Sequence, residues 1–171
     1  RRAEDGIVVV NELPIETYLC RVVPSEMPAS YELEALKAQA VCARSYAYRQ
    51  MESYGYPENE AHVNDSTDYQ VYGNSLPDER ADRAVEETEG ECLYYDGELA
   101  QAYYHSSDGG ATEDVRNIWD STADLPHLKG VIDPYEETVN SINGQSPWTV
   151  TYTAAQLEDR LHSRYYGTGH S

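Results

Sequence analysis

One carboxylate, Glu26, stands between two prolines in residues 24–28 (PSEMP). Each proline fixes its own φ and restricts the residue before it, so we expect a rigid hinge here between two helices. Val22, Val23 and Met27 are its apolar neighbours in sequence. A carboxyl held in such a constrained, partly apolar setting suits a general acid. A surface turn that happens to contain a glutamate would show the same pattern, and this alternative stays open here.

Helical patterns flank this stretch on both sides. The first begins at Leu13-Pro14, and we expect it to end at or near Pro24. Ser30 is a suitable cap for the second, which we expect over residues 31–52. Its apolar stripe is rich in alanine, which lets another element approach closely. We therefore expect the second helix to be central to the core.

The remaining elements are expected to be short. The link Asp96-Gly97 predicts a hairpin, because an Asp-Gly pair accepts the backbone of a tight two-residue turn. The other expected elements are a buried strand at 6–10, a strand at 67–72, a helix at 76–88, hairpin strands at 91–95 and 99–105, a strand at 149–153, and a helix at 154–162 capped by Thr153. Together they predict an α+β fold, with N-terminal helices packed on a small antiparallel sheet and irregular connections. We expect a single domain over residues 1–171.

The charge of the chain restricts its partners. The formal charge is −19, from 31 acidic and 12 basic side chains. Phosphate binding needs a basic footprint, so we expect no nucleic-acid partner. A neutral polymer, a sugar or a cationic group remains possible. Tyrosine occurs 16 times and phenylalanine is absent, which suits a polar groove as well as the edge of a core.

The cysteines, Cys20, Cys42 and Cys92, are odd in number and form no CxxC pair. Cys20 and Cys42 fall within helical, apolar patterns, which favours buried free thiols. A disulfide between two of the cysteines is the alternative.

A polar, glycine-rich turn follows His105 at residues 106–110. Such a turn can bring backbone close to a ligand, and it can equally be a plain loop. His105 beside Ser106 does not indicate a serine hydrolase, because the chain has no GxSxG elbow and no separately placed acid.

Blocks of residues in a fixed order carry a resemblance to a known family. The blocks are 12–19 (ELPIETYL), 22–28 (VVPSEMP), 33–41 (LEALKAQAV), 43–47 (ARSYA), 65–72 (DSTDYQVY) and 104–110 (YHSSDGG). They resemble the core of stage II sporulation protein D (SpoIID) and of the related LytB amidase-enhancer domains, over roughly residues 7–160. The block SEMP followed by EALKAQA is the specific part of the match.

The resemblance implies a lytic transglycosylase of peptidoglycan that acts in sporulation, in degradation of the septal wall during engulfment. Such an enzyme cleaves the MurNAc–GlcNAc linkage of denuded glycan strands and leaves 1,6-anhydroMurNAc ends. The family's catalytic acid corresponds to Glu26. Most glycosidases use two carboxylates. Here one suffices, because the C6 hydroxyl of the sugar replaces water and one residue can act first as acid and then as base.

Other polar residues in the matching blocks are expected to line a glycan groove. They are Ser66, Gln70, Tyr104, His105 and Ser106. An ordinary structural hydrogen bond is an equally good account of each. We expect no zinc and no other cofactor. Some family members bind zinc through Cys and His in the block that matches residues 62–69, where this chain has one histidine and no cysteine.

The amidase-enhancer relatives imply a second function class, a non-catalytic peptidoglycan-binding module that activates an N-acetylmuramoyl-L-alanine amidase. A cell-wall amidase is therefore an expected partner, together with glycan strands. The chain opens at Arg1 rather than Met, and we expect a piece truncated at both ends. The expected location is extracytoplasmic, at the cell wall or septum, with a membrane anchor in an N-terminal segment outside this sequence.

Overall fold

The structure, a computed structural model, describes residues 2–3, 6–73, 76–119, 124–136, 138 and 149–165. The chain divides into two compact units, Arg1–His105 and Ser106–Ser171. The expectation of a single domain over residues 1–171 stays a prediction. The α+β class is confirmed, since helices and short antiparallel strands both occur.

Helix α1 (Ile15–Glu26) ends near Pro24, but the proline lies inside the helix. Pro24 has no N–H for the carbonyl one turn earlier, that of Cys20. The Arg21 side chain donates to this carbonyl at 3.3 Å, and the N–H of Met27 bonds the Val23 carbonyl at 3.0 Å. The expectation of a hinge is therefore wrong in one respect, because Glu26 is the last helical residue and not part of a linker.

Helix α2 (Leu33–Gln50) confirms the long central helix. Its N-cap is Glu32, without a side-chain cap bond, so the expected cap at Ser30 is wrong. The reason is that the N–H of Tyr31 bonds the Pro28 carbonyl at 3.0 Å, which keeps residues 28–31 in a turn before the helix begins. The expected apolar stripe is buried at Leu36, Ala40, Ala43 and Ala47.

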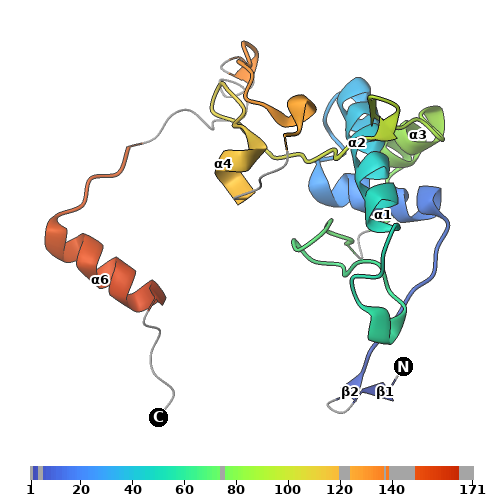
Figure 1. Cartoon of the computed structure of the whole chain (residues 1–171), viewed down its shortest axis with the longest axis horizontal. Helices are drawn as coiled ribbons and strands as arrows, with labels where there is room; N and C mark the ends of the chain where they lie inside the picture. Colours follow the sequence, from blue (N-terminus) through green and yellow to red (C-terminus); the bar gives the residue numbers. More distant parts are fainter. Residues whose placement is uncertain are drawn as a thin grey trace. The chain divides into compact units, whose positions relative to one another are not determined.

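Helix α3 (Glu79–Glu87) is capped by Asp78, which accepts from the N–H groups of Arg80 and Ala81. It packs against α1 and α2, which also pack against each other (Figure 1). The buried core consists of Leu19, Val22, Val23, Leu36, Ala40, Ala43, Ala81, Ala84 and Val85. Small residues on α2 and α3 allow this close approach, so the core of the first unit is helix on helix.

The strands are only two residues long. Strand β1 (Arg2–Ala3) pairs antiparallel with β2 (Gly6–Ile7). Strand β3 (Tyr94–Tyr95) pairs with β4 (Glu98–Leu99), with Tyr94 opposite Leu99. Between them Asp96 and Gly97 have φ of 51° and 81°, the backbone of a type I′ turn, which confirms the turn of the hairpin. The expected strand bounds of 91–95 and 99–105 are wrong, because only residues 94–95 and 98–99 pair.

The expected buried strand at residues 6–10 is wrong. Only residues 6–7 are paired, and the side chains of Ile7 and Val9 are 82% and 86% exposed. A two-residue ribbon has no second layer to cover an apolar face, so the run of valines stays at the surface in the described part of the chain.

The expected strand at residues 67–72 is also wrong, because side chains in this segment form local turns. Asn64 accepts from both the N–H and the hydroxyl of Ser66 at 2.9 Å. The Ser66 hydroxyl in turn accepts from the N–H of Asp68 at 3.2 Å. Such bonds give the backbone an alternative to a strand ladder. Just before this segment lies the 3₁₀ helix η1 (Pro57–Asn59).

The second unit contains helix α4 (Val115–Trp119), the 3₁₀ helix η2 (Pro126–Leu128) and helix α6 (Ala154–Tyr165). Thr153 accepts from the N–H of Gln156 at 3.3 Å, which confirms the expected cap. Residues 149–153 are not a strand, contrary to expectation. Among the described helices, none combines the length and apolar character needed to cross a membrane.

All three cysteines are free, as favoured over a disulfide. Cys20 and Cys42 are half-buried and not buried as expected, and Cys92 is half-buried too. Burial, followed by a hydrogen bond with Asp82, raises the pKa of the Cys20 thiol to about 11. Burial also raises the pKa of Cys42 and of Cys92. These thiols are therefore mainly protonated near neutral pH.

Candidate active site

The Glu26 carboxylate is held at the C-terminal end of α1 by backbone from the loop at residues 71–73. Its Oε1 accepts a hydrogen bond of 2.7 Å from the N–H of Val71. The adjacent Ser25 hydroxyl donates to the Arg21 carbonyl at 2.6 Å and accepts from the N–H of Gly73 at 3.0 Å. The helix end and the loop are thus joined at two neighbouring residues, and the half-buried carboxylate has a defined orientation.

A buried amide, Gln70, links two tyrosines beside this loop. The hydroxyl of Tyr18 donates to Gln70 Oε1 at 3.3 Å, and Gln70 Nε2 donates to the hydroxyl of Tyr104 at 3.0 Å. Gln70 Nε2 also donates to the Ala43 carbonyl at 3.2 Å. Gln70 is only 1% exposed. The amide therefore ties α1, α2 and the segment after β4 together at one point.

Tyrosine hydroxyls lie within the electrostatic influence of Glu26. Burial raises the pKa of Tyr18, and the nearby Tyr46 hydroxyl and the Glu26 charge add to the rise. Burial likewise raises the pKa of Tyr104, partly offset by its bond with Gln70, and Glu26 again raises it. Both hydroxyls are protonated at neutral pH. Tyr18 donates its proton to Gln70, whereas Tyr104 accepts from Gln70 and keeps its own O–H as a donor.

Tyr46, from α2, belongs to the same group. Burial raises its pKa, followed by the effects of Tyr103, Tyr69 and Glu26. Its ring meets those of Tyr103 and Tyr104 edge-on, at centroid distances of 6.1 Å and 6.5 Å. Such edge contacts are a favoured geometry for aromatic pairs, so the Tyr46 ring is held in place by its two neighbours.

An ion pair between the buried Arg44 and the partly exposed Glu16 joins the helices of the first unit. Arg44 is fully buried and binds Glu16 through two bonds, Nε to Oε1 at 2.9 Å and Nη2 to Oε2 at 2.7 Å. It also donates to the carbonyls of Val85 and Glu91 at 3.2 Å and 3.1 Å. One guanidinium therefore joins α1, α2, α3 and the segment before β3.

Comparison with known families gives this arrangement its context. Residues 3–95 match the sequence profile of a family described as SpoIID, stage II sporulation protein. The chain belongs to the SpoIID family. The matched range contains Glu26, Gln70 and the three helices of the first unit, so the resemblance drawn from the sequence is confirmed.

Curated relatives agree with this membership. The chain is 39% identical over 139 residues to the amidase enhancer of Bacillus subtilis (strain 168), an alignment that covers 81% of this chain and 17% of the relative. It is 32% identical over 173 residues to stage II sporulation protein D of the same strain, covering 93% of this chain and 49% of the relative. A stage II sporulation protein D from Bacillus amyloliquefaciens is 34% identical over 142 residues, covering 75% and 41%. The chain thus spans about half or less of the length of these relatives.

The structure brings together some of the residues expected at the site of this SpoIID-family chain. Gln70 and Tyr104 are bonded to each other, and Tyr104 lies within the influence of Glu26. Ser66 forms the local turn with Asn64 described above, and His105 is exposed. Neither Ser66 nor His105 hydrogen-bonds Glu26 among the residues that the structure describes. Ser106 is exposed and begins the second unit.

Two groups at this site, the side chain of Tyr18 and the N–H of Val71, were not predicted from the sequence. Tyr18 precedes Glu26 by about two helical turns, a spacing that places side chains near one face of a helix. This signal was available, but it depends on a helix that continues through Pro24. The N–H of Val71 is a backbone donor, and nothing in the identity of a valine indicates that role.

Acidic groups gather in the second unit of this SpoIID-family chain. Asp108, Asp133 and Glu136 have ligand oxygens within 4.8 Å of one another. The hydroxyl of Ser107 donates to Glu136, and Asp108 accepts from the N–H of Gly110 at 2.7 Å. These bonds account for part of the cluster without an ion, and we assign no metal to it.

Proposed function

We propose that this protein is a lytic transglycosylase that cleaves the MurNAc–GlcNAc linkage of denuded peptidoglycan strands, with Glu26 as general acid and base. The observation that carries the proposal is the setting of Glu26. Its carboxylate is oriented by the N–H of Val71 and lies within the electrostatic influence of the hydroxyls of Tyr18 and Tyr104.

The chemistry requires a single carboxyl. The protonated Glu26 gives its proton to the glycosidic oxygen as the bond from that oxygen to C1 of MurNAc breaks, which leaves an oxocarbenium-like sugar. The resulting carboxylate then takes the proton of the C6 hydroxyl of the same sugar, whose oxygen bonds to C1. The products are a 1,6-anhydroMurNAc end and a free GlcNAc hydroxyl, and Glu26 is again protonated.

The surrounding residues support this cycle by position. The bond from the N–H of Val71 holds one oxygen of the carboxylate, Oε1, in place. Gln70, buried and bonded on both sides, holds the hydroxyls of Tyr18 and Tyr104 in place. Groups that are already in position need no reorganisation when charge shifts during the reaction. The negative charge of the chain, −19, disfavours the carboxylates of stem peptides, which suits strands from which these peptides have been removed.

The relatives named stage II sporulation protein D, at 32% and 34% identity, support a role in sporulation. We place the protein outside the cytoplasm, at the cell wall or septum, with glycan strands as substrate. An N-terminal segment outside this sequence would supply the membrane anchor. These statements rest on the family and not on the geometry of Glu26.

The test is a digest of denuded glycan strands by the wild-type protein and by Glu26→Gln, with products analysed by mass spectrometry. The matched control is Glu89→Gln, which makes the same chemical change at an exposed residue after α3. Wild type and control should give 1,6-anhydro ends, and Glu26→Gln should give none. Reducing ends from the wild type would instead indicate hydrolysis by water with a second carboxylate.

A second candidate function is favoured by the relative named amidase enhancer, at 39% identity. In this account the domain binds peptidoglycan and activates an N-acetylmuramoyl-L-alanine amidase without cutting glycan. This second function predicts that Glu26→Gln and the wild type stimulate a cell-wall amidase to the same extent. No glycan product from either protein, with amidase stimulation by both, would establish this function in place of the first.

A further inference from the structure

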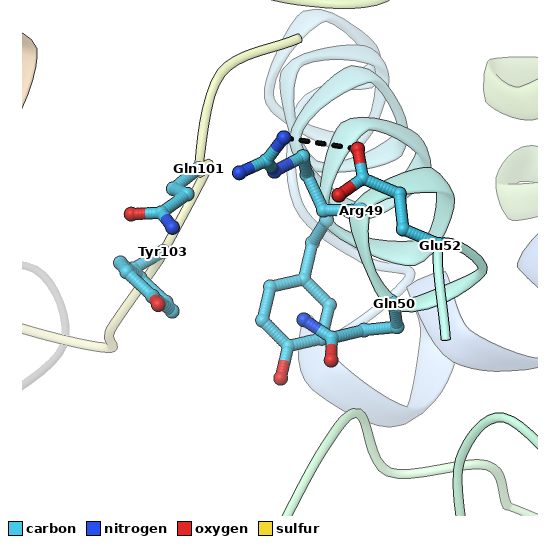
Figure 2. A pocket seen from close by; sticks show the side chains of 6 residues that line it. Arg49, Gln50, Glu52, Gln101 and Tyr103 are labelled. Atoms are coloured by element: carbon cyan, nitrogen blue, oxygen red, sulfur yellow. Dashed lines mark hydrogen bonds and ion pairs between the residues drawn. The ribbon is translucent and has the colours of Figure 1, made fainter. Parts of the chain in front are cut away.

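A shallow pocket lies beside the Glu26 cluster, in the first unit. It has a volume of about 120 Å³ and is lined by Tyr46, Arg49, Gln50, Glu52, Gln101 and Tyr103. Figure 2 shows Gln101 and Tyr103, from the segment after β4, on one side of the pocket, and Arg49 and Gln50, near the end of α2, on the other. The pocket therefore has one wall from a helix and one from an extended segment.

Tyr46 connects this pocket to the proposed catalytic group. It lines the pocket, its ring meets that of Tyr104 at 6.5 Å, and the Glu26 carboxylate contributes to the rise in its pKa. A ligand that occupies the pocket would therefore contact a ring that also packs against Tyr104, the partner of Gln70.

The lining of the pocket selects a neutral, polar ligand. Arg49 Nη1 and Glu52 Oε1 are 2.9 Å apart, so their charges offset each other at the rim (Figure 2). Gln50 and Gln101 each carry an amide that can both donate and accept. The rings of Tyr46 and Tyr103 offer flat apolar faces with polar tips. Hydroxyl and acetamido groups on a ring match this combination better than an anion or a purely apolar molecule does.

The size of the pocket restricts the ligand further. Pockets that enclose a whole small molecule measure about 300 Å³ or more, whereas this one measures about 120 Å³. It suits part of a longer ligand that lies across the surface, with one unit seated between the two walls. A polysaccharide strand has this repeating form.

We infer that this pocket is a saccharide subsite, which holds one N-acetylhexosamine unit of a glycan strand while a neighbouring unit lies at Glu26. The inference rests on the proposed function, since it takes the glycan strand as the ligand. Occupation of the subsite makes binding depend on chain length, because a strand must reach both the subsite and Glu26.

The test is a titration of Glu26→Gln, in which no cleavage interferes, with β-1,4-linked N-acetylglucosamine oligomers of two and six units. NMR follows the side-chain amides of Gln50 and Gln101. The hexamer should shift both amides and bind at least tenfold more tightly than the dimer. Adding Gln50→Ala and Gln101→Ala together should remove this advantage of length, whereas adding Asn11→Ala, at an exposed amide outside the pocket, should not.

Two results would overturn the inference. One is a hexamer that fails to bind, or that leaves both pocket amides unshifted. The other is a double glutamine variant, with Glu26 intact, that cleaves strands with unchanged KM. In that second case the transglycosylase stands and the subsite fails. Conversely, pocket-dependent binding of the hexamer with no cleavage by the wild type would leave the subsite standing and remove the proposed activity.

Discussion

The carboxylate of Glu26 accepts a 2.7 Å hydrogen bond from the backbone N–H of Val71, a residue 45 positions later in the chain. This bond joins the end of α1 to the loop at residues 71–73. The same loop begins just after Gln70, whose buried amide is bonded to the hydroxyls of Tyr18 and Tyr104. One short segment therefore sets the orientation of both the carboxylate and the tyrosines around it.

Shortening the carboxylate should break this bond. In Glu26→Asp the carboxylate is one methylene shorter, so the N–H of Val71 loses its acceptor and exchanges faster with solvent. Glu26→Gln keeps an oxygen at the same reach and should keep the protection of Val71. Hydrogen exchange measured by NMR compares the two variants, with the N–H of Gly73, held by Ser25, as internal reference. Glycan cleavage should fall at least about a hundredfold in both variants. Equal protection of Val71 in Glu26→Asp and wild type would contradict the geometry.

Removing the Gln70 side chain should destabilise the protein. Gln70→Ala leaves the Ala43 carbonyl and two tyrosine hydroxyls without their bonds in a site that is 1% exposed. The expected loss in free energy of unfolding is about 1–3 kcal/mol for the unsatisfied groups. Urea denaturation measures it against Asn11→Ala, an exposed amide that should change stability by less than about 0.5 kcal/mol. A loss for Gln70→Ala no larger than that of this control would rule out the bridging role.

Removing the buried Arg44 from its ion pair should cost more than breaking an exposed pair. Arg44→Met leaves Glu16 without its partner and removes the bonds to the carbonyls of Val85 and Glu91. The expected loss in free energy of unfolding is about 3–5 kcal/mol. The matched control is Arg83→Met, which removes an exposed pair with Glu87 and should cost about 1 kcal/mol or less. Similar denaturation midpoints for the two variants would argue against a supporting role for Arg44.

Alkaline pH should weaken the fold through the buried tyrosines. The pKa of Tyr18 and of Tyr104 is raised above the ordinary 10.0 in the folded protein. The unfolded chain therefore releases these protons first, so the stability that they contribute is complete below pH 10 and is lost as pH rises above it. Tyr18→Phe should flatten the fall of stability above about pH 10, as measured by urea denaturation. Tyr94→Phe, at a ring that is 66% exposed, should leave the slope unchanged. A slope that is the same in Tyr18→Phe and wild type would contradict this account.

Some features were predictable from the sequence because they depend on a few neighbouring residues. The Asp96-Gly97 turn follows from the ease with which these residues adopt positive φ. The cap at Thr153 and the alanine-rich stripe of α2 follow from local bonding and helical period. The importance of Glu26 was also visible, since the residues around it match the SpoIID family, to which the chain belongs.

Other features depend on contacts between distant residues, and only the tertiary structure decided them. Pro24 stays within α1 because the Arg21 side chain satisfies the freed carbonyl, so Glu26 ends a helix instead of lying on a hinge. The Ser66 hydroxyl closes a turn with Asn64, which is the structural hydrogen bond given as the alternative, and its place in a glycan groove stays a prediction. Sequence by itself determined the fold class, the hairpin and the candidate acid. The partner of Glu26 is a backbone N–H, which any residue at position 71 other than proline would carry. The identity of residue 71 therefore does not indicate this contact, and only the packing of the helices decided which loop reaches the acid.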